Sequence, residues 1–145
     1  MDTNSAARPW HLWVVGVLGT LWNSGGAIDY TMSNMHNASY MAAFTPEQLS
    51  YFDSFPAWAT GFWALGVWGA FVGSLLLLFR SRRAVPAFAI AMIGLAGVTA
   101  YQMTTPALPE SFKTASSIGF TATIWIATAL LLWYAVRMRR SGILR

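Results

Sequence analysis

Four long apolar segments constrain this chain more than any other feature of its sequence. They run over residues 10–28, 57–79, 84–103 and 115–136, and the last three contain no charged residue in their interiors. Each approaches or exceeds the roughly 20 residues that a helix needs to cross a hydrocarbon core of about 30 Å. The composition agrees, because 56% of the residues are hydrophobic and only 10% are charged, against about a quarter in soluble proteins. We therefore predict an all-α polytopic membrane protein, with four transmembrane helices in an antiparallel bundle.

The chain length predicts one domain, residues 1–145. The loops between the apolar segments are too short for a second folded unit, which needs at least about 50 residues. Bulky residues continue up to Asn23 and no A-x-A pattern follows them, so we expect the first segment to be an uncleaved helix rather than a signal peptide. The sequence contains no cysteine, which excludes disulfides and thiolate metal sites.

The basic residues predict how the helices are oriented in the membrane. In the four-span arrangement, eight of the nine basic residues lie on one side and four of the five acidic residues on the other. Basic residues in short loops stay on the cytoplasmic side, so we expect both termini on the cytoplasmic side of the membrane. The inner-side residues are Arg8, Arg80, Arg82, Arg83, Arg137, Arg139, Arg140 and Arg145.

These arginines indicate membrane lipids rather than nucleic acid as the partner of the basic surface. They cluster just beyond helix ends, where they attract anionic lipid headgroups. No second signal of nucleic-acid recognition accompanies them.

Small residues recur at a spacing that brings helices close together. The motifs GVLG (16–19), GVWG (66–69) and GLAG (94–97) place two glycines on neighbouring turns of three different segments. Small side chains let helix backbones approach in a membrane. The sequence thus predicts tight packing between these segments.

The only long loop, residues 29–56, contains TPEQLSYFDSFP. Thr45 and Gln48 have the spacing of a capping box, with Pro46 at the first helical position. We expect a short interfacial helix near residues 46–54, serving either as a lid or as a cover for the helix ends.

Polar residues gather in the outer half of the predicted bundle. There they form either a small outward-facing polar cavity or ordinary hydrogen bonds between helices, and the sequence leaves both interpretations open. The candidate ligand-binding residues are Asn23, Asp29, Thr60, Gln102, Ser117 and Thr121.

A surface stripe is expected if the first helix continues beyond the bilayer. Ser33 and His36 then align with Asp29 and Tyr40. The stripe offers too few ligands for a metal site, but His36 beside Asp29 could sense pH. No catalytic or phosphate-binding motif occurs and no histidine pair suits haem, so we expect neither enzymatic activity nor a cofactor.

The stretches LWNSGGAIDYTMSN, YMAAFTPEQLSYFDSFPAWATGFWALGVWGAFVGSLLLL and RSRRAVPAFAIAMIGL resemble a group of small four-helix bacterial inner-membrane proteins. Some members of that group are labelled as sugar transporters. The resemblance covers most of residues 12–103 and brings no binding or catalytic residues with it. It implies a bacterial inner-membrane setting and raises a hypothesis of solute transport.

Two functions therefore follow from the sequence. One is binding or transport of a small solute through the outward-facing cavity, with a homo-oligomer supplying a pathway that four helices alone are too few to enclose. The other is a noncatalytic accessory or assembly subunit of a larger membrane complex.

Overall fold

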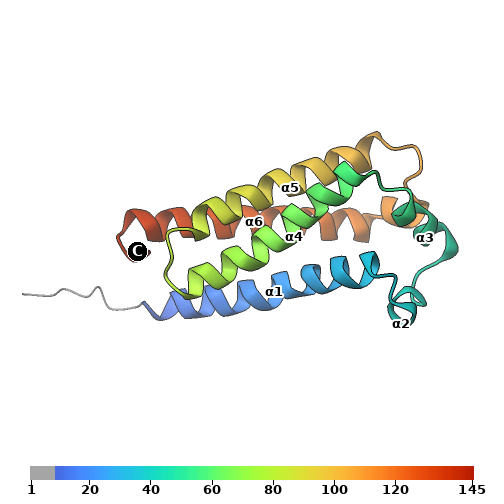
Figure 1. Ribbon diagram of the computed structural model, residues 1–145. Helices are drawn as coiled ribbons and strands as arrows, with labels where there is room; N and C mark the ends of the chain where they lie inside the picture. Colours follow the sequence, from blue (N-terminus) through green and yellow to red (C-terminus); the bar gives the residue numbers. More distant parts are fainter. Residues whose placement is uncertain (1–8) are drawn as a thin grey trace, which may run out of the picture.

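The computed structural model describes residues 9–145, and within that range the chain forms helices and no strand (Figure 1). Arg8, which contributes to the predicted topology, lies outside the described residues. The long helices are α1 (Trp10–Asn34), α4 (Ala57–Leu78), α5 (Ala84–Thr104) and α6 (Ala115–Arg140). Short ones lie between them: α2 (Ala38–Met41), α3 (Pro46–Asp53) and the 3-10 turn η1 (Glu110–Lys113).

Three helices of the described chain, α4, α5 and α6, are long and apolar enough to cross a membrane. This finding supports a membrane location for the protein. The 25-residue α1 is outside that set. Its apolar first half is followed by polar residues from Asn23 onward, including Asp29, so the fourth predicted span stays a prediction.

Helices α4 and α5 pack more extensively than any other pair, and glycines permit their approach. A Cβ atom at Gly94 would overlap the backbone nitrogen of Gly66 and lie 2.6 Å from the carbonyl oxygen of Phe62. A Cβ atom at Gly69 would lie 3.0 Å from the backbone nitrogen of Ala91. The predicted tight packing of GVWG and GLAG is confirmed for this pair.

A compact apolar core occupies the end of the molecule where α4 passes into α5. The last residues of the chain close this core: the Arg82 N–H donates to the Arg145 carbonyl at 3.1 Å, and the Arg145 N–H donates to the Arg80 carbonyl at 2.7 Å. This pairing holds Leu144 fully buried. Helices α5 and α6 lie close together at this end and spread apart toward η1 (Figure 1). The core comprises Leu12, Leu77, Ala84, Phe88, Leu131, Ala135, Met138 and Leu144.

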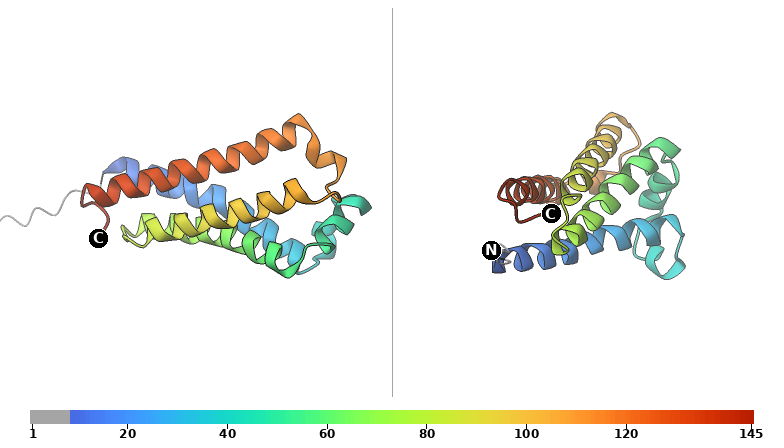
Figure 2. Two further views of the ribbon diagram at one scale, coloured as in Figure 1. Left: turned by 90° about the horizontal axis from the view of Figure 1, so that it is seen from above. Right: turned by 60° about the vertical axis from the view of Figure 1, so that its left-hand side comes forward.

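The short helices α2 and α3 lie at the opposite end of the molecule from the C-terminus (Figure 2). Helix α3 begins with the predicted capping box, in which the Thr45 hydroxyl accepts from the Gln48 N–H and the Gln48 side chain accepts from the Thr45 N–H. Its Tyr51 ring lies against Tyr101 of α5 and Phe112 of η1. Helix α3 thus packs against the end of α5 and against η1.

Candidate functional site

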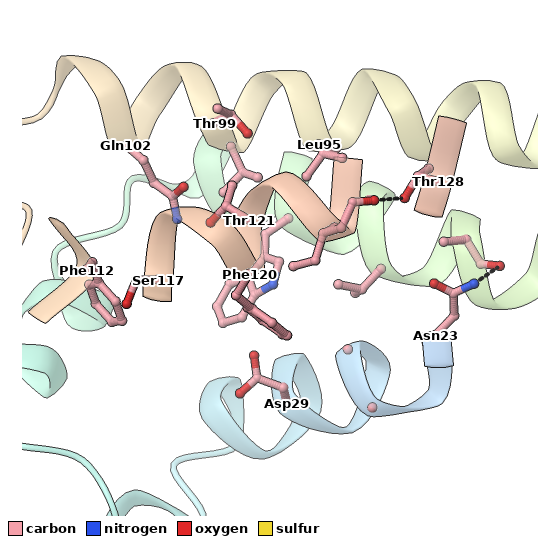
Figure 3. A pocket seen from close by; sticks show the side chains of 18 of the residues that line it. Asn23, Asp29, Leu95, Thr99, Gln102, Phe112, Ser117, Phe120, Thr121 and Thr128 are labelled. Atoms are coloured by element: carbon pink, nitrogen blue, oxygen red, sulfur yellow. Dashed lines mark hydrogen bonds between the residues drawn. The ribbon is translucent and has the colours of Figure 1, made fainter. Parts of the chain in front are cut away.

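A cavity of about 860 Å³ lies between α1, α4, α5 and α6, in the half of the molecule nearest α3 and η1 (Figure 3). Its volume is in the range of about 300–1,000 Å³ that is usual for small-molecule sites. Figure 3 shows Asp29 on α1, Gln102 on α5 and Thr121 on α6 around the same space. Five of the six candidate ligand-binding residues line this cavity: Asn23, Asp29, Gln102, Ser117 and Thr121.

Asn23 lies at the inner end of the cavity, where its side chain is 8% exposed. Its Nδ2 donates to the Ser74 hydroxyl at 2.9 Å and toward the Ala70 carbonyl at 3.3 Å. The amide therefore ties α1 to α4. Its oxygen points away from Ser74 (Figure 3).

Asp29 lies near the end of the cavity closest to α2 and accepts a hydrogen bond from Tyr40 of that helix. The Tyr40 hydroxyl is 2.5 Å from Asp29 Oδ1. Burial first, and then the hydrogen bond to Asp29, raises the pKa of Tyr40 to about 12. Because the hydroxyl stays protonated at neutral pH, it donates to Asp29 throughout the physiological range.

The remaining polar residues of the cavity differ in whether their hydrogen bonds are already made. Ser117 donates to the Ser111 carbonyl at 2.9 Å and takes part in the cap of α6. Thr99 accepts from the Trp125 indole at 3.2 Å. Among the described residues, no side chain or carbonyl forms a hydrogen bond with the Gln102 amide or the Thr121 hydroxyl, so these two groups are free to meet a ligand.

Aromatic side chains form much of the cavity wall, although none of them is among the candidate ligand-binding residues predicted from the sequence. The rings of Trp22 and Phe120 lie 6.1 Å apart across the opening between α1 and α6. The aromatic residues that line the cavity are Trp22, Tyr40, Tyr51, Phe52, Phe55, Trp63, Phe112 and Phe120. No sequence spacing relates rings from so many elements, since they meet only through the fold.

Tyr51 is 3% exposed, and its hydroxyl has no hydrogen-bond partner among the described residues. Burial raises the pKa of Tyr51 to about 12. The group is thus a neutral donor at the end of the cavity closest to α3, where Tyr51 contributes to the wall.

Of the six candidate ligand-binding residues, Thr60 is the one that does not line the cavity. Its hydroxyl lies 3.5 Å from the carbonyl of Pro56, one turn earlier in α4. Hydroxyls in helices often bond to their own backbone in this way. Thr60 lies at a depth in the bundle similar to that of the other candidates, but its side of α4 does not face the cavity.

The predicted surface stripe is also wrong as a continuous helical face. Helix α1 ends at Asn34, and His36 has a φ of 50°, which breaks the helical path. Ser33 is buried rather than on the surface, and its Oγ has no partner among the described residues. His36 pairs with Asp53 at 3.0 Å instead of with Asp29.

Comparison of the chain with protein-family models, curated proteins and solved structures finds no match. The arrangement of the cavity itself therefore carries the functional interpretation.

Proposed function

We propose that this chain is an inner-membrane protein of bacteria whose four long helices form an antiparallel bundle and bind a small solute in an outward-facing cavity. Both termini lie in the cytoplasm in this proposal. Arginines between α4 and α5 and at the end of α6 support the orientation, as does the acidic character of the opposite end. Asp29, Glu47, Asp53 and Glu110 all lie in or beside the short elements of that end.

Two properties support a span for α1 as well. Its 25 residues extend about 38 Å at 1.5 Å per residue, which exceeds the hydrocarbon thickness of about 30 Å. The exposed side chains in its first half are all hydrophobic: Trp10, Trp13, Val14, Val17, Leu18, Leu21 and Trp22. Such a surface is stable against lipid tails and costly in water.

The observation that carries the proposal is the convergence of unpaired polar groups on one cavity. Gln102 and Thr121 come from different helices and face the space that Asp29 borders (Figure 3). Polar groups at membrane depth need partners. A bound solute supplies them here, with no catalytic step and no cofactor.

A substitution that fills the cavity with a larger side chain tests whether the cavity binds solutes. Purified protein in lipid nanodiscs is melted with and without a panel of sugars, amino acids and amines, because a ligand that binds the folded state raises the melting temperature. We expect at least one class of solute to stabilise the wild type. Thr121→Phe should weaken the binding of that class at least about tenfold, or by about 1.4 kcal/mol. Thr60→Phe is the matched control, since Thr60 lies outside the cavity.

The proposal fails if the folded protein neither binds any member of the panel nor moves it across a reconstituted membrane. It also fails if Thr121→Phe and Thr60→Phe behave alike. Flux in the absence of any effect of Thr121→Phe would place the solute pathway elsewhere.

One observation favours the accessory subunit as a second candidate function. Only 11% of the apolar stretch of α6 is buried inside the molecule, compared with 22% for α4 and for α5. Most of α6 is therefore open to lipid, to a second copy or to another membrane protein. Purification in mild detergent with identification of comigrating proteins separates these cases, and a solitary protein or homo-oligomer would exclude the accessory function.

A further inference from the structure

The charge of the cavity is determined by one residue. Of all the side chains that line it, Asp29 is the only one from the Asp, Glu, Lys, Arg and His classes. Its hydrogen-bond partner, the Tyr40 hydroxyl, is neutral. The ion pairs of the described chain involve other acids, Asp53 with His36 and Glu110 with Lys113. Asp29 thus brings a negative charge that no described basic side chain neutralises.

Asp29 is partly buried, and moving a carboxylate without a countercharge partly out of water has a free-energy cost. A cation in the cavity would recover part of that cost. The aromatic wall acts in the same direction, since the face of an aromatic ring attracts a positive charge. Trp22 lies seven residues before Asp29, on the same face of α1, and its ring contacts Phe120.

The cavity favours an organic cation over a metal ion. Metal ions such as Mg²⁺ and Ca²⁺ need about six or more oxygen ligands, and the described residues contain no group of three or more His, Cys, Asp or Glu side chains suited to a metal. The volume of about 860 Å³ is far larger than one ion occupies. Gln102 and Thr121, which lack hydrogen-bond partners among the described residues, can bind a polar group elsewhere on the ligand.

We infer that the solute is a small organic cation, an ammonium compound that places its positive charge at Asp29 and its apolar body against the aromatic wall. This inference rests on the proposed function, which it narrows to one class of ligand.

A matched series of probes isolates the effect of charge. At pH 7, 2-phenylethylamine, 2-phenylethanol and phenylacetate have similar size and carry charges of about +1, 0 and −1, as the ordinary pKa values of amines and carboxylic acids require. Benzyltrimethylammonium adds a cation that cannot lose a proton. We expect calorimetry on the protein in nanodiscs to show at least about tenfold tighter binding of both cations than of the alcohol, and the weakest binding for phenylacetate.

Asp29→Asn tests the assigned residue. The asparagine oxygen still accepts from Tyr40, so the variant should fold, and circular dichroism with size-exclusion chromatography checks that it does. We expect amine and alcohol to bind this variant with affinities within about twofold of each other. Asp53→Asn is the matched control, because Asp53 is an exposed acid outside the cavity, and it should keep the preference for the cations.

Equal binding of amine and alcohol to the wild type, or a preference that persists in Asp29→Asn, would overturn the inference. If the alcohol or a sugar binds and Thr121→Phe abolishes that binding, the proposed function stands and the cation inference alone fails. If no probe of this series binds, the cation inference also fails. The proposed function is then tested separately, by the panel of sugars, amino acids and amines and the Thr121→Phe variant.

Discussion

Asn23 shows how one buried polar residue of α1 is accommodated. It could have faced a ligand or a neighbouring helix, and its amide nitrogen bonds to Ser74 and Ala70 of α4. The need for a partner follows from the sequence, because an unpaired amide in hydrocarbon is costly. The identity of that partner depends on how α1 and α4 are rotated against each other.

A double-mutant cycle measures this contact. We expect Asn23→Ala and Ser74→Ala each to lower the free energy of unfolding, with a coupling of about 0.6 kcal/mol and at most about 1.7 kcal/mol, the range found for hydrogen bonds between membrane helices. Reversible unfolding in mixed detergent micelles provides the measurement. Purely additive losses would show that the hydrogen bond is absent in the folded protein.

The pair of His36 and Asp53 gives the segment between α1 and α4 a pH dependence. The hydrogen bond to Asp53 is the largest cause that raises the pKa of His36 above 6.5, followed by the Asn34 carbonyl and the charge of Asp53. Because the folded state binds the proton more tightly, this stabilisation is fully present below pH 6.5 and is lost as the pH rises through the folded-state pKa. The effect is small, since both side chains are exposed to solvent.

An NMR titration of the His36 ring tests that direction. We expect a pKa above 6.5 in the wild type and a lower value in Asp53→Asn. Glu47→Gln removes another acid of the same loop and should leave the His36 value unchanged. A His36 pKa that does not respond to Asp53→Asn would remove this pair from any pH response.

At the level of elements, the packing of α4 against α5 depends on the absence of side chains at a few positions. Gly94 faces the backbone of α4 so closely that a methyl group has no space. Gly119 of α6 has open space around it, because a Cβ at that position would have no heavy atom within 4 Å apart from its chain neighbours and the backbone of its own helix. In the sequence, Gly94 belongs to the GLAG motif, whereas Gly119 is the only glycine of its apolar segment. The structure agrees with this difference, because another helix approaches Gly94 closely and none approaches Gly119.

Substitution by alanine should separate the two positions. We expect Gly94→Ala to destabilise the protein by about 1–3 kcal/mol, because the helices must move apart to accept the methyl group. Gly119→Ala should be neutral or stabilising by up to about 1 kcal/mol, since alanine is the better helix former. Thermal melting of both variants gives the comparison, and equal effects would contradict the close approach of α4 and α5.

At the level of the whole molecule, the two halves of the described structure have different interiors. The half that contains the C-terminus is filled by the apolar core, and the other half holds the cavity. Leu144 completes the core because the backbone around it pairs with Arg80 and Arg82. The short tail after α6, residues 141–145, gives no sign of this in the sequence.

Leu144→Ala tests the contribution of the tail. We expect a loss of about 2–5 kcal/mol in the free energy of unfolding, as for other buried leucines. Leu130→Ala is the matched control, since Leu130 is 58% exposed on α6, and its loss should be much smaller. Similar melting temperatures for the two variants would show that Leu144 is not part of the core.

The sequence by itself determined the helical class, the starts of α4, α5 and α6, the capping box of α3 and the close packing around Gly94. Each of these depends on local patterns: apolar runs, capping side chains and the spacing of small residues. Their predicted starts at residues 57, 84 and 115 agree with Ala57, Ala84 and Ala115. Local patterns also indicated a polar outer half, from which five cavity residues were found.

Only the tertiary structure decided which polar residues share a cavity, which rings form its wall and what surrounds the charge of Asp29. It shows that Thr60 does not line the cavity, that Trp22, Phe120 and Tyr40 do, and that His36 pairs with Asp53. The physical reason is that each of these facts depends on the rotation and separation of helices distant in the chain. Periodicity shows which residues share one helix face, but only packing determines what that face meets.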